Sequence, residues 1–311
     1  MLIQARSFNN ITILDDFTIR KSSQDKNKLL GEYRWLKDGY GFNCPKVCNY
    51  LDNDGYASYD IEYIHGKTLA QLYINEELSI EEFRNIFEFL KSIIFVNREI
   101  GVLKGDSYGA NEVKRMYTTK TIERLRSYGY NFHKPFILNN DLLPDLNTII
   151  KNCSVNVEKE DLCYMHGDLC FSNIILSDDY YKTKNLATSL YFIDPRGINF
   201  HKDITALGEY KYEIGKLAHS VIGKYDLIKA NKIEAIEQNT YNFKYNYIVS
   251  DYKQEIDKLF FEIFGDNEIW YNIMVNLFLS MIPLHSDNPK HQVTIFANAL
   301  RLYKEKTIKF N

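Results

Sequence analysis

Two apolar runs that end in polar side chains place the strongest constraint on the fold of this chain. Tyr164–Leu176 consists of an apolar lead-in, the tripeptide His-Gly-Asp, a short loop and a second apolar run, and Tyr191–Gly197 is another β-rich segment with a carboxylate near its end. Asp168 and Asn173 lie five positions apart, so one loop can direct both side chains into one cleft. Asp194, at the end of the next strand, can join them there. The sequence therefore predicts two carboxylates and an amide at one end of a strand–loop–strand unit.

These three side chains suit phosphoryl transfer. A carboxylate has to meet the attacking hydroxyl, while an amide oxygen and a second carboxylate hold Mg²⁺ on the nucleotide phosphates. Asp168 is then the catalytic residue, and Asn173 and Asp194 are the metal ligands. A His-Gly-Asp tripeptide alone is also found in ordinary turns, because Gly and Asp are frequent turn residues.

The paired motifs resemble those of the aminoglycoside phosphotransferase and choline kinase branch of the protein-kinase-like superfamily. There a His-Gly-Asp-x-x-x-x-Asn loop and an Ile-Asp-x-x-Gly strand end have these duties, and His166–Asn173 and Ile193–Gly197 match them. The resemblance implies an α+β, protein-kinase-like two-lobed fold, with a small antiparallel β-sheet N-lobe carrying one helix and a larger, mainly α-helical C-lobe. It implies residues 1–63 as the nucleotide-binding lobe and 64–311 as the catalytic and substrate-binding lobe. ATP, or GTP, would lie between them with Mg²⁺.

The N-terminal segment reads as strands separated by turns, followed by a helix. A nucleotide kinase needs a cation on the phosphates, and Lys21 at a strand end is placed to supply it. Glu32 in the following helical stretch is the expected partner that holds it extended. A solvated strand end is the other reading of Lys21, and Arg20 is a competitor for the role. Strands are expected at 2–6, 11–14 and 17–21, and the helix at 25–37.

A Gly-rich phosphate loop of the protein-kinase type is absent, and a polar turn stands in its place. Ser7, Asn9 and Asn10 in this turn offer hydroxyl, amide and backbone N–H groups to phosphate oxygens. We therefore include them among the expected nucleotide-binding residues.

Two more strands, at 44–51 and 56–63, lead into a segment that resembles the hinge between the lobes of the family. The resemblance implies that the purine bonds the backbone of Glu62, Tyr63 and Ile64. His65, the next residue, is expected to face solvent.

The remainder reads as a helical scaffold. Ser79 and Glu82 form a capping-box pattern at the start of a long core helix. A second helix carries a basic cluster (Lys114, Arg115, Lys120, Arg124 and Arg126), which is either a solvated face or a contact for a phosphorylated or acidic ligand. Further helices are expected at 142–151, 208–217, 260–282 and 293–304, and a hairpin should pair 174–176 with 190–193.

Three residues are candidates for substrate contact, and one acidic residue is a candidate support. His166 precedes the catalytic aspartate, Arg196 can contact the substrate or the transferred phosphoryl group or form a structural ion pair, and His285 lies in a polar loop. Glu213 stands where the family has an acidic residue that braces the catalytic loop.

Composition limits the class of protein. The 311 residues are 45% hydrophobic and 25% charged, as in globular domains, and a net charge of −3 without a basic run argues against nucleic-acid binding. Five cysteines and an N-terminus without a signal-peptide pattern favour a cytoplasmic protein with free thiols. No apolar run reaches the roughly 18–20 residues that cross a bilayer, so no membrane insertion is expected.

The expected activity is an ATP- and Mg²⁺-dependent transfer of phosphate to a hydroxyl of a small molecule such as a sugar, an amino alcohol or an amino acid. The Ala-Pro-Glu element of peptide kinases is missing, and no dense acidic cluster suits an aminoglycoside. By analogy with similar proteins alone, a part for the product in cell-surface polysaccharide (capsule) decoration is a further expectation. A nucleotide-binding pseudokinase and an atypical protein kinase are the alternatives, and the oligomeric state stays open.

Overall fold

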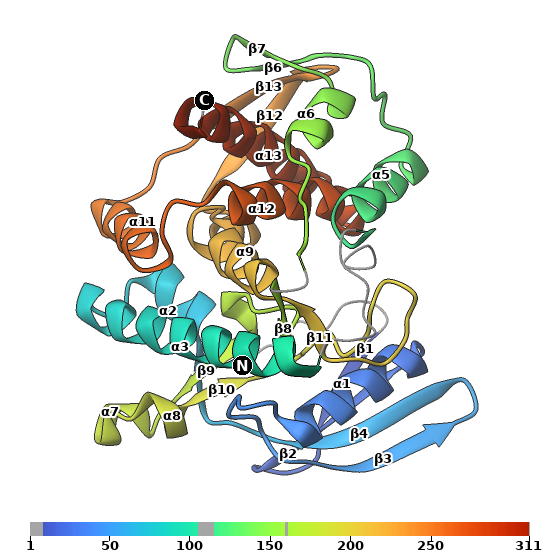
Figure 1. Ribbon diagram of the computed structural model, residues 1–311, viewed down its shortest axis with the longest axis vertical. Coiled ribbons are helices and arrows are strands. Elements are labelled where there is room, and N and C mark those ends of the chain that lie inside the picture. The colour runs from blue at the N-terminus through green and yellow to red at the C-terminus, as the bar shows by residue number, and fades with distance from the viewer. Residues whose placement is uncertain (1–8, 105–114, 159–160, 311) are drawn as a thin grey trace.

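A small N-terminal sheet and a larger helical part make up the molecule (Figure 1), a computed structural model that describes residues 9–104, 115–158 and 161–310. Four antiparallel strands form the N-terminal sheet in the order β1-β2-β4-β3. The elements of this part are β1 (Asn9–Ile13), β2 (Thr18–Ser23), α1 (Lys26–Asp38), β3 (Val47–Asn53) and β4 (Tyr56–Glu62). This is the sheet with one helix that the sequence predicts for the smaller lobe.

Strand β1 begins earlier than expected. Asn9 pairs with Ser23 and Asn10 with Ser22, so both asparagines belong to the strand and their assignment to a turn is wrong. Pairing with β2 overrides the low strand propensity of asparagine. Ser7 and the strand expected at 2–6 lie outside the described residues.

Helix α1 is defined by its caps and by one buried face. The Asp25 side chain accepts the Lys28 N–H at 3.2 Å, and Gly39, at φ 70°, ends the helix by donating its N–H to the Trp35 carbonyl. The helix also approaches the segment after Asp194 very closely. A Cβ on Gly31 would lie 2.5 Å from the Gly197 carbonyl oxygen, so only glycine allows this contact.

The larger part is built from helices around one apolar core. The predicted capping box is confirmed, because the Ser79 N–H donates to Glu82 Oε2 (3.0 Å) and the Glu82 N–H donates to Ser79 Oγ (3.2 Å). Helix α12 is buried along most of its length between its neighbours (Figure 1). The helices are α2 (Leu69–Asn75), α3 (Ile80–Lys104), α5 (Thr118–Ser127), α6 (Leu146–Asn152), α9 (Tyr210–Val221), α10 (Tyr225–Lys229), α11 (Asp251–Phe264), α12 (Glu268–Met281) and α13 (Pro289–Phe310).

The prediction of a single helix over 260–282 is wrong, because two helices, α11 and α12, occupy this range. Helix α11 ends at Phe264, because Gly265 takes a φ of 75°. The Asn267 side chain then accepts the Ile269 N–H at 2.8 Å and starts α12. A glycine stop and an asparagine cap lie two positions apart in the sequence, and the apolar residues on both sides of them concealed the break.

A four-stranded sheet in the C-terminal part was not expected. Its order is β12-β13-β6-β7, and β13 pairs with β6 in parallel although about a hundred residues separate them. Its strands are short and partly polar, so the sequence pattern gives little sign of them. They are β6 (Phe136–Leu138), β7 (Asp141–Leu143), β12 (Glu234–Asn239) and β13 (Asn242–Asn246).

Two small sheets between the two parts hold the predicted catalytic segments. The predicted hairpin is confirmed, since β9 (Ile174–Ser177) and β10 (Leu190–Phe192) pair antiparallel. Strand β5 (Gly66–Thr68) adds to β9, and β8 (Leu162–Tyr164) pairs with β11 (Leu207–Glu209). The remaining short elements are η2 (Phe171–Asn173), α7 (Tyr180–Thr183), α8 (Leu186–Ser189) and η3 (Ile282–His285).

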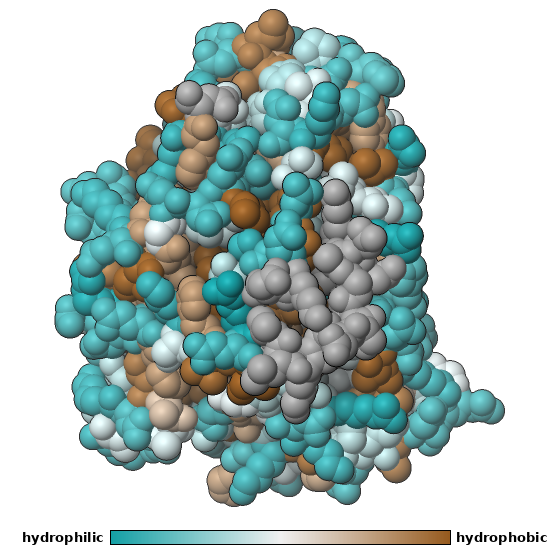
Figure 2. All heavy atoms as spheres, viewed as in Figure 1, coloured by the Kyte–Doolittle hydropathy of each residue, from teal (hydrophilic) through white to brown (hydrophobic). Residues whose placement is uncertain are grey.

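The surface is mixed in character. Figure 2 shows one face on which hydrophilic residues predominate and apolar residues form small separate groups. Within the described ranges, no helix combines the length and the apolar character that crossing a membrane requires.

Candidate active site

The loop between β8 and β9 carries the predicted catalytic residue. It turns at Gly167, which has a φ of 76°. A Cβ at this position would also lie 2.7 Å from the Cβ of Arg196, so glycine is required for both reasons. The turn places Asp168 with one third of its side chain exposed, directly before the short helix η2 that ends at Asn173.

Glu213 on α9 braces this loop from below. Its two carboxylate oxygens accept the N–H groups of His166 (2.7 Å) and Gly167 (2.9 Å). The side chain is buried, and burial raises the pKa of Glu213 to about 7, although the two backbone hydrogen bonds lower it. Glutamate therefore makes the contact that the resemblance implied for an acidic residue here.

Replacing Glu213 with glutamine should loosen the loop. Glutamine can accept one of the two N–H groups, but its own NH₂ then faces the other donor, so we expect turnover to fall by about 10–100-fold. Because the folded-state pKa of Glu213 is raised, the stability it contributes is present at low pH and is lost as pH rises from about 5 to 8. Unfolding curves at these two pH values should show the advantage of the wild type over Glu213→Gln shrinking with pH. Equal turnover in both proteins would contradict the bracing role.

Lys21, on the inner strand β2, meets Glu32 of α1 and Asp194 on one face of the N-terminal sheet. The Lys21 ammonium lies 2.5 Å from Glu32 Oε1 and 2.8 Å from Asp194 Oδ1. Glu32 also accepts the hydroxyl of Tyr59. The expected Lys21–Glu32 contact is therefore present, and the same lysine reaches the strand end that carries Asp194. Arg20, the competing cation, pairs instead with Asp60 at 2.7 Å.

The charges in this group support one another. Burial lowers the pKa of Lys21, but Asp194 and Glu32 raise it further, so the lysine stays charged. Burial raises the pKa of Asp194, but Lys21 and Lys28 more than offset this and hold it below its usual range. Asp194 also has a φ of 56°, a left-handed conformation that is uncommon outside glycine and is often found at functional sites.

Asn173 and Asp194 are joined through the backbone. The Ile193 N–H donates to the Asn173 carbonyl oxygen at 3.0 Å, which brings the residue before Asp194 against the end of η2. The Asn173 side chain donates its Nδ2 to the Asp168 carbonyl oxygen at 2.9 Å. This hydrogen bond fixes the amide and leaves Oδ1 as the atom that can bind a metal.

The oxygen atoms present fit Mg²⁺ better than a softer metal. Asn173 supplies an amide oxygen and Asp194 a carboxylate that is 39% exposed. The described parts of the chain contain no group of three or more His, Cys, Asp or Glu side chains that could hold a metal ion. A cation here would have to complete its shell with phosphate oxygens and water, as Mg²⁺ does on nucleotides.

Lys216 is the residue of this site that the sequence analysis missed. Its ammonium lies 2.5 Å from Asp168 Oδ1, and its side chain is almost buried. Burial lowers the pKa of Lys216, but Asp168 raises it further. The sequence did contain a signal for this contact. Lys216 lies three residues after Glu213, and residues at this spacing share one helix face.

His166 does not contact a substrate, so this prediction is wrong. The ring is 0% exposed, its Nδ1 accepts the Asp168 N–H (3.3 Å) and its Nε2 donates to the Ile193 carbonyl (3.0 Å). Burial lowers the pKa of His166 to about 4, so the ring is neutral. It links the catalytic loop to the strand end that carries Asp194.

The prediction that His285 contacts the substrate is also wrong. His285 lies in η3 rather than in an open loop, is 6% exposed and hydrogen-bonds the Tyr225 hydroxyl at 3.3 Å. Arg196 is different, since it is half-buried and donates Nε to the Ile198 carbonyl (3.1 Å) and Nη1 to the Tyr212 hydroxyl (3.3 Å). The structural ion pair considered for it is not seen among the described residues.

Two of the three predicted hinge residues use their backbone N–H groups in hydrogen bonds within the protein. The Glu62 N–H donates to the Lys46 carbonyl (2.8 Å) and the Tyr63 N–H to the Phe17 carbonyl (2.7 Å). These two donors are therefore used by the sheet. Ile64, the third predicted hinge residue, lies two residues after the end of β4.

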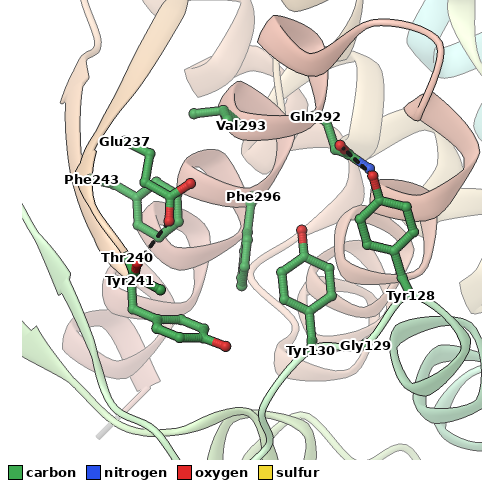
Figure 3. A pocket seen from close by; sticks show the side chains of 10 residues that line it. All are labelled: Tyr128, Gly129, Tyr130, Glu237, Thr240, Tyr241, Phe243, Gln292, Val293 and Phe296. Carbon is green, nitrogen blue, oxygen red and sulfur yellow. Dashed lines mark hydrogen bonds between the residues drawn. The ribbon is translucent and has the colours of Figure 1, made fainter.

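A separate cavity lies away from these residues. It has a volume of about 250 Å³, and aromatic side chains from α13, β13 and the segment after α5 surround it (Figure 3). None of the predicted site residues lines it, and Tyr130, Tyr241 and Phe296 shape its walls. It takes no part in the site described above.

Comparisons with known proteins bear on the fold. No protein-family model matches the chain, and no curated protein matches it. Among solved structures, a variant of an aminoglycoside 2′-phosphotransferase of type IIIa in complex with GDP has a TM-score of 0.55 and 11% identity, over 98% of this chain and 90% of that one. A Haemophilus somnus protein assigned as a fructosamine-3-kinase has a TM-score of 0.51 and 11% identity, over 93% and 83%. The predicted fold class is thereby confirmed, and the chain has the two-lobed α+β fold of kinase-like proteins.

Proposed function

We propose that this protein is a phosphotransferase that moves the γ-phosphoryl group of ATP, or of GTP, to a hydroxyl of a small molecule. The observation that carries the proposal is the contact of Lys21 with both Glu32 and Asp194 beside the Asp168–Asn173 loop. These residues come from distant parts of the sequence and form the set that phosphoryl transfer requires. The fold shared with small-molecule kinases, one of them solved with GDP, is consistent with it.

In this proposal the nucleotide lies between the two lobes, which divide at residues 63 and 64. The backbone at Ile64 and its neighbours would bind the purine, and Lys21, held by Glu32, would bind the phosphates. Mg²⁺, when bound at Asn173 and Asp194, supplies positive charge against the phosphate oxygens. Asn10 pairs with Ser22, so its side chain lies on the opposite face of the sheet from Lys21, and it is left out of the proposed phosphate contacts.

Asp168 would orient the acceptor hydroxyl and take its proton. The neighbouring Lys216 ammonium, at 2.5 Å, favours the ionised carboxylate that this role needs. Glu213 holds the loop so that Asp168 keeps its direction. Most of the rate would come from positioning and from charge neutralisation, because phosphoryl transfer asks for little covalent chemistry from the protein.

The proposed acceptors are a sugar, an amino alcohol or an amino acid, and a part in cell-surface polysaccharide decoration rests on analogy alone. A screen with γ-³²P-labelled ATP and GTP, Mg²⁺ and a panel of small hydroxyl compounds tests the activity. We expect label in one class of compound and none without the divalent cation. Nucleotide binding without any transfer would replace the proposal with a pseudokinase, and label in the polypeptide would replace it with a protein kinase.

A further inference from the structure

A cationic cluster lies on the C-lobe side of Asp168, and the proposed reaction has used only one of its members. We define it as Lys120 on α5, Arg196 after β10 and Lys216 on α9. The charges of Arg196 and Lys216 act on Lys120, so three segments that are distant in the sequence bring positive charge to one place. Lys21, which serves the proposed nucleotide site, comes from the N-terminal sheet and is not part of this cluster.

Hydrogen bonds and ring contacts connect the members to the catalytic loop. Lys216 lies against Asp168, and the Arg196 N–H donates to the His166 carbonyl at 2.8 Å. Arg196 Nη1 donates to the Tyr212 hydroxyl, and the Tyr212 ring stacks on Tyr117 with 5.6 Å between centroids. Tyr117 directly precedes α5, whose first turn carries Lys120.

The cluster has more positive than negative charge. Within the described residues neither Lys120 nor Arg196 forms an ion pair, and Asp168 is the carboxylate that Lys216 meets. Burial, with the charges of Arg196, Arg124 and Lys216, holds the pKa of Lys120 well below its usual value, and Asp168 alone acts in the other direction. Like charges placed together in a partly buried site are unfavourable until an anion joins them, and such sites are often binding sites.

We propose that the acceptor is an anionic hydroxyl compound, carrying a carboxylate or a phosphate group, and that Lys120, Arg196 and Lys216 bind this anionic group beside Asp168. The inference rests on the proposed phosphotransferase function and narrows its substrate class. A polycationic aminoglycoside or a choline-like amino alcohol would meet repulsion here. The sequence left two interpretations of the basic cluster on this helix, a solvated face or a contact for an acidic ligand. In this proposal one member of that cluster, Lys120, belongs to the acceptor site.

The test compares acceptors that differ in charge but share a hydroxyl. Glycerol, glycerate and glycerol 3-phosphate form one series, and glucose, glucuronate and glucose 6-phosphate form another, with ethanolamine and kanamycin as cations. We expect kcat/KM for an anionic member to exceed that for its neutral counterpart by about tenfold or more, since one charged hydrogen bond is worth this much. The carboxylate and phosphate members tell the two sources of the anion apart.

Variants at Lys120 assign the effect to the cluster. Lys120→Met should raise the acceptor KM by about tenfold or more and leave the KM for ATP unchanged, and Lys120→Arg should restore most of the affinity. Arg126→Met is the matched control, because it removes the same charge from an exposed position of the same helix. Melting curves and circular dichroism establish that each variant is folded.

The outcomes separate this inference from the proposed function. Transfer to a neutral or cationic compound in preference to its anionic counterpart overturns the inference and leaves the kinase intact. An equal rise in the ATP KM and the acceptor KM of Lys120→Met also overturns it, because the cluster would then serve the nucleotide. Absence of transfer to every compound, in a protein that does not hydrolyse ATP, overturns the proposed function and the inference with it.

Discussion

Replacing Asp168 with asparagine should lower kcat by roughly 10²–10⁴-fold, the usual contribution of a group that accepts a proton in the transition state. Asparagine keeps the size of the side chain, but its amide cannot take the proton of the attacking hydroxyl. The lysine that lies 2.5 Å from the carboxylate would also lose its charged partner. Affinity for ATP should change little, since the proposed phosphate contacts come from Lys21 and from the metal at Asn173 and Asp194. Steady-state kinetics and calorimetric titration with ATP measure the two effects separately.

The matched control for Asp168→Asn is a second aspartate that lies away from the site. Asp179→Asn removes a carboxylate that is 75% exposed on a distant turn, and it should leave both kcat and ATP binding as they are. If Asp168→Asn remains folded yet loses ATP binding, the residue belongs to the nucleotide site and its assigned role is wrong. If it keeps its full kcat, Asp168 is not the proposed base.

Local signals in the sequence predicted much of this fold. The Ser79–Glu82 capping box and the β9–β10 hairpin depend on residues close together in the chain, so their patterns can be read directly. Glu213 also followed from a motif, and its two hydrogen bonds to the catalytic loop are present. The parallel pairing of β13 with β6 has no such signal, because it depends on segments far apart.

The predictions that His166 and His285 contact the substrate failed because the fold buries both side chains. His166 stands next to the catalytic aspartate, and from the sequence alone a polar residue there suggests substrate contact. The structure surrounds its ring with Trp35 of α1, Phe42 of the segment after α1 and Phe192 of β10, and the nearest centroid is 5.1 Å away. Residues that arrive from elsewhere in the chain set the environment of a side chain, so its role follows from packing rather than from its neighbours in sequence.

The same reasoning explains how Lys216 escaped notice. A lysine in an amphipathic helix is usually exposed, and the motif drew attention to Glu213 alone. Once Glu213 is known to face the loop, the residue one turn later has to face it as well. Its pairing with Asp168 is therefore a tertiary consequence of a local contact that the sequence did predict.

Replacing Lys21 with methionine should damage both stability and activity. Glu32 is 2% exposed and would lose the cation that balances its charge, and breaking such a buried pair costs about 3–5 kcal/mol of unfolding free energy. The proposed phosphate contact would be lost as well, which should reduce kcat/KM for ATP by about 10²–10³-fold. Lys26→Met is the control, since it breaks an exposed ion pair with Asp52, and exposed pairs contribute little to stability.

The effect on stability has a predictable dependence on pH. Burial already raises the pKa of Glu32 in the wild type, although Lys21 and the Tyr59 hydroxyl lower it. Without Lys21 that pKa rises further, so the buried carboxyl of Lys21→Met is protonated at low pH and has to ionise as pH rises. A folded-state pKa above the unfolded one means that stability is lost with rising pH. Urea unfolding should therefore show a larger deficit at pH 8 than at pH 5.

The double variant Lys21→Met/Glu32→Gln separates the two roles of the lysine. Glutamine removes the unpaired charge but keeps an acceptor for the Tyr59 hydroxyl, so most of the lost stability should return. Activity should stay low, because neither methionine nor glutamine can neutralise phosphate. A double variant that regains both stability and turnover would show that Lys21 only balances Glu32, and the assignment of the nucleotide site to this face of the sheet would then be wrong. A stable but inactive double variant is the result that the contact of one ammonium with Glu32 and Asp194 predicts.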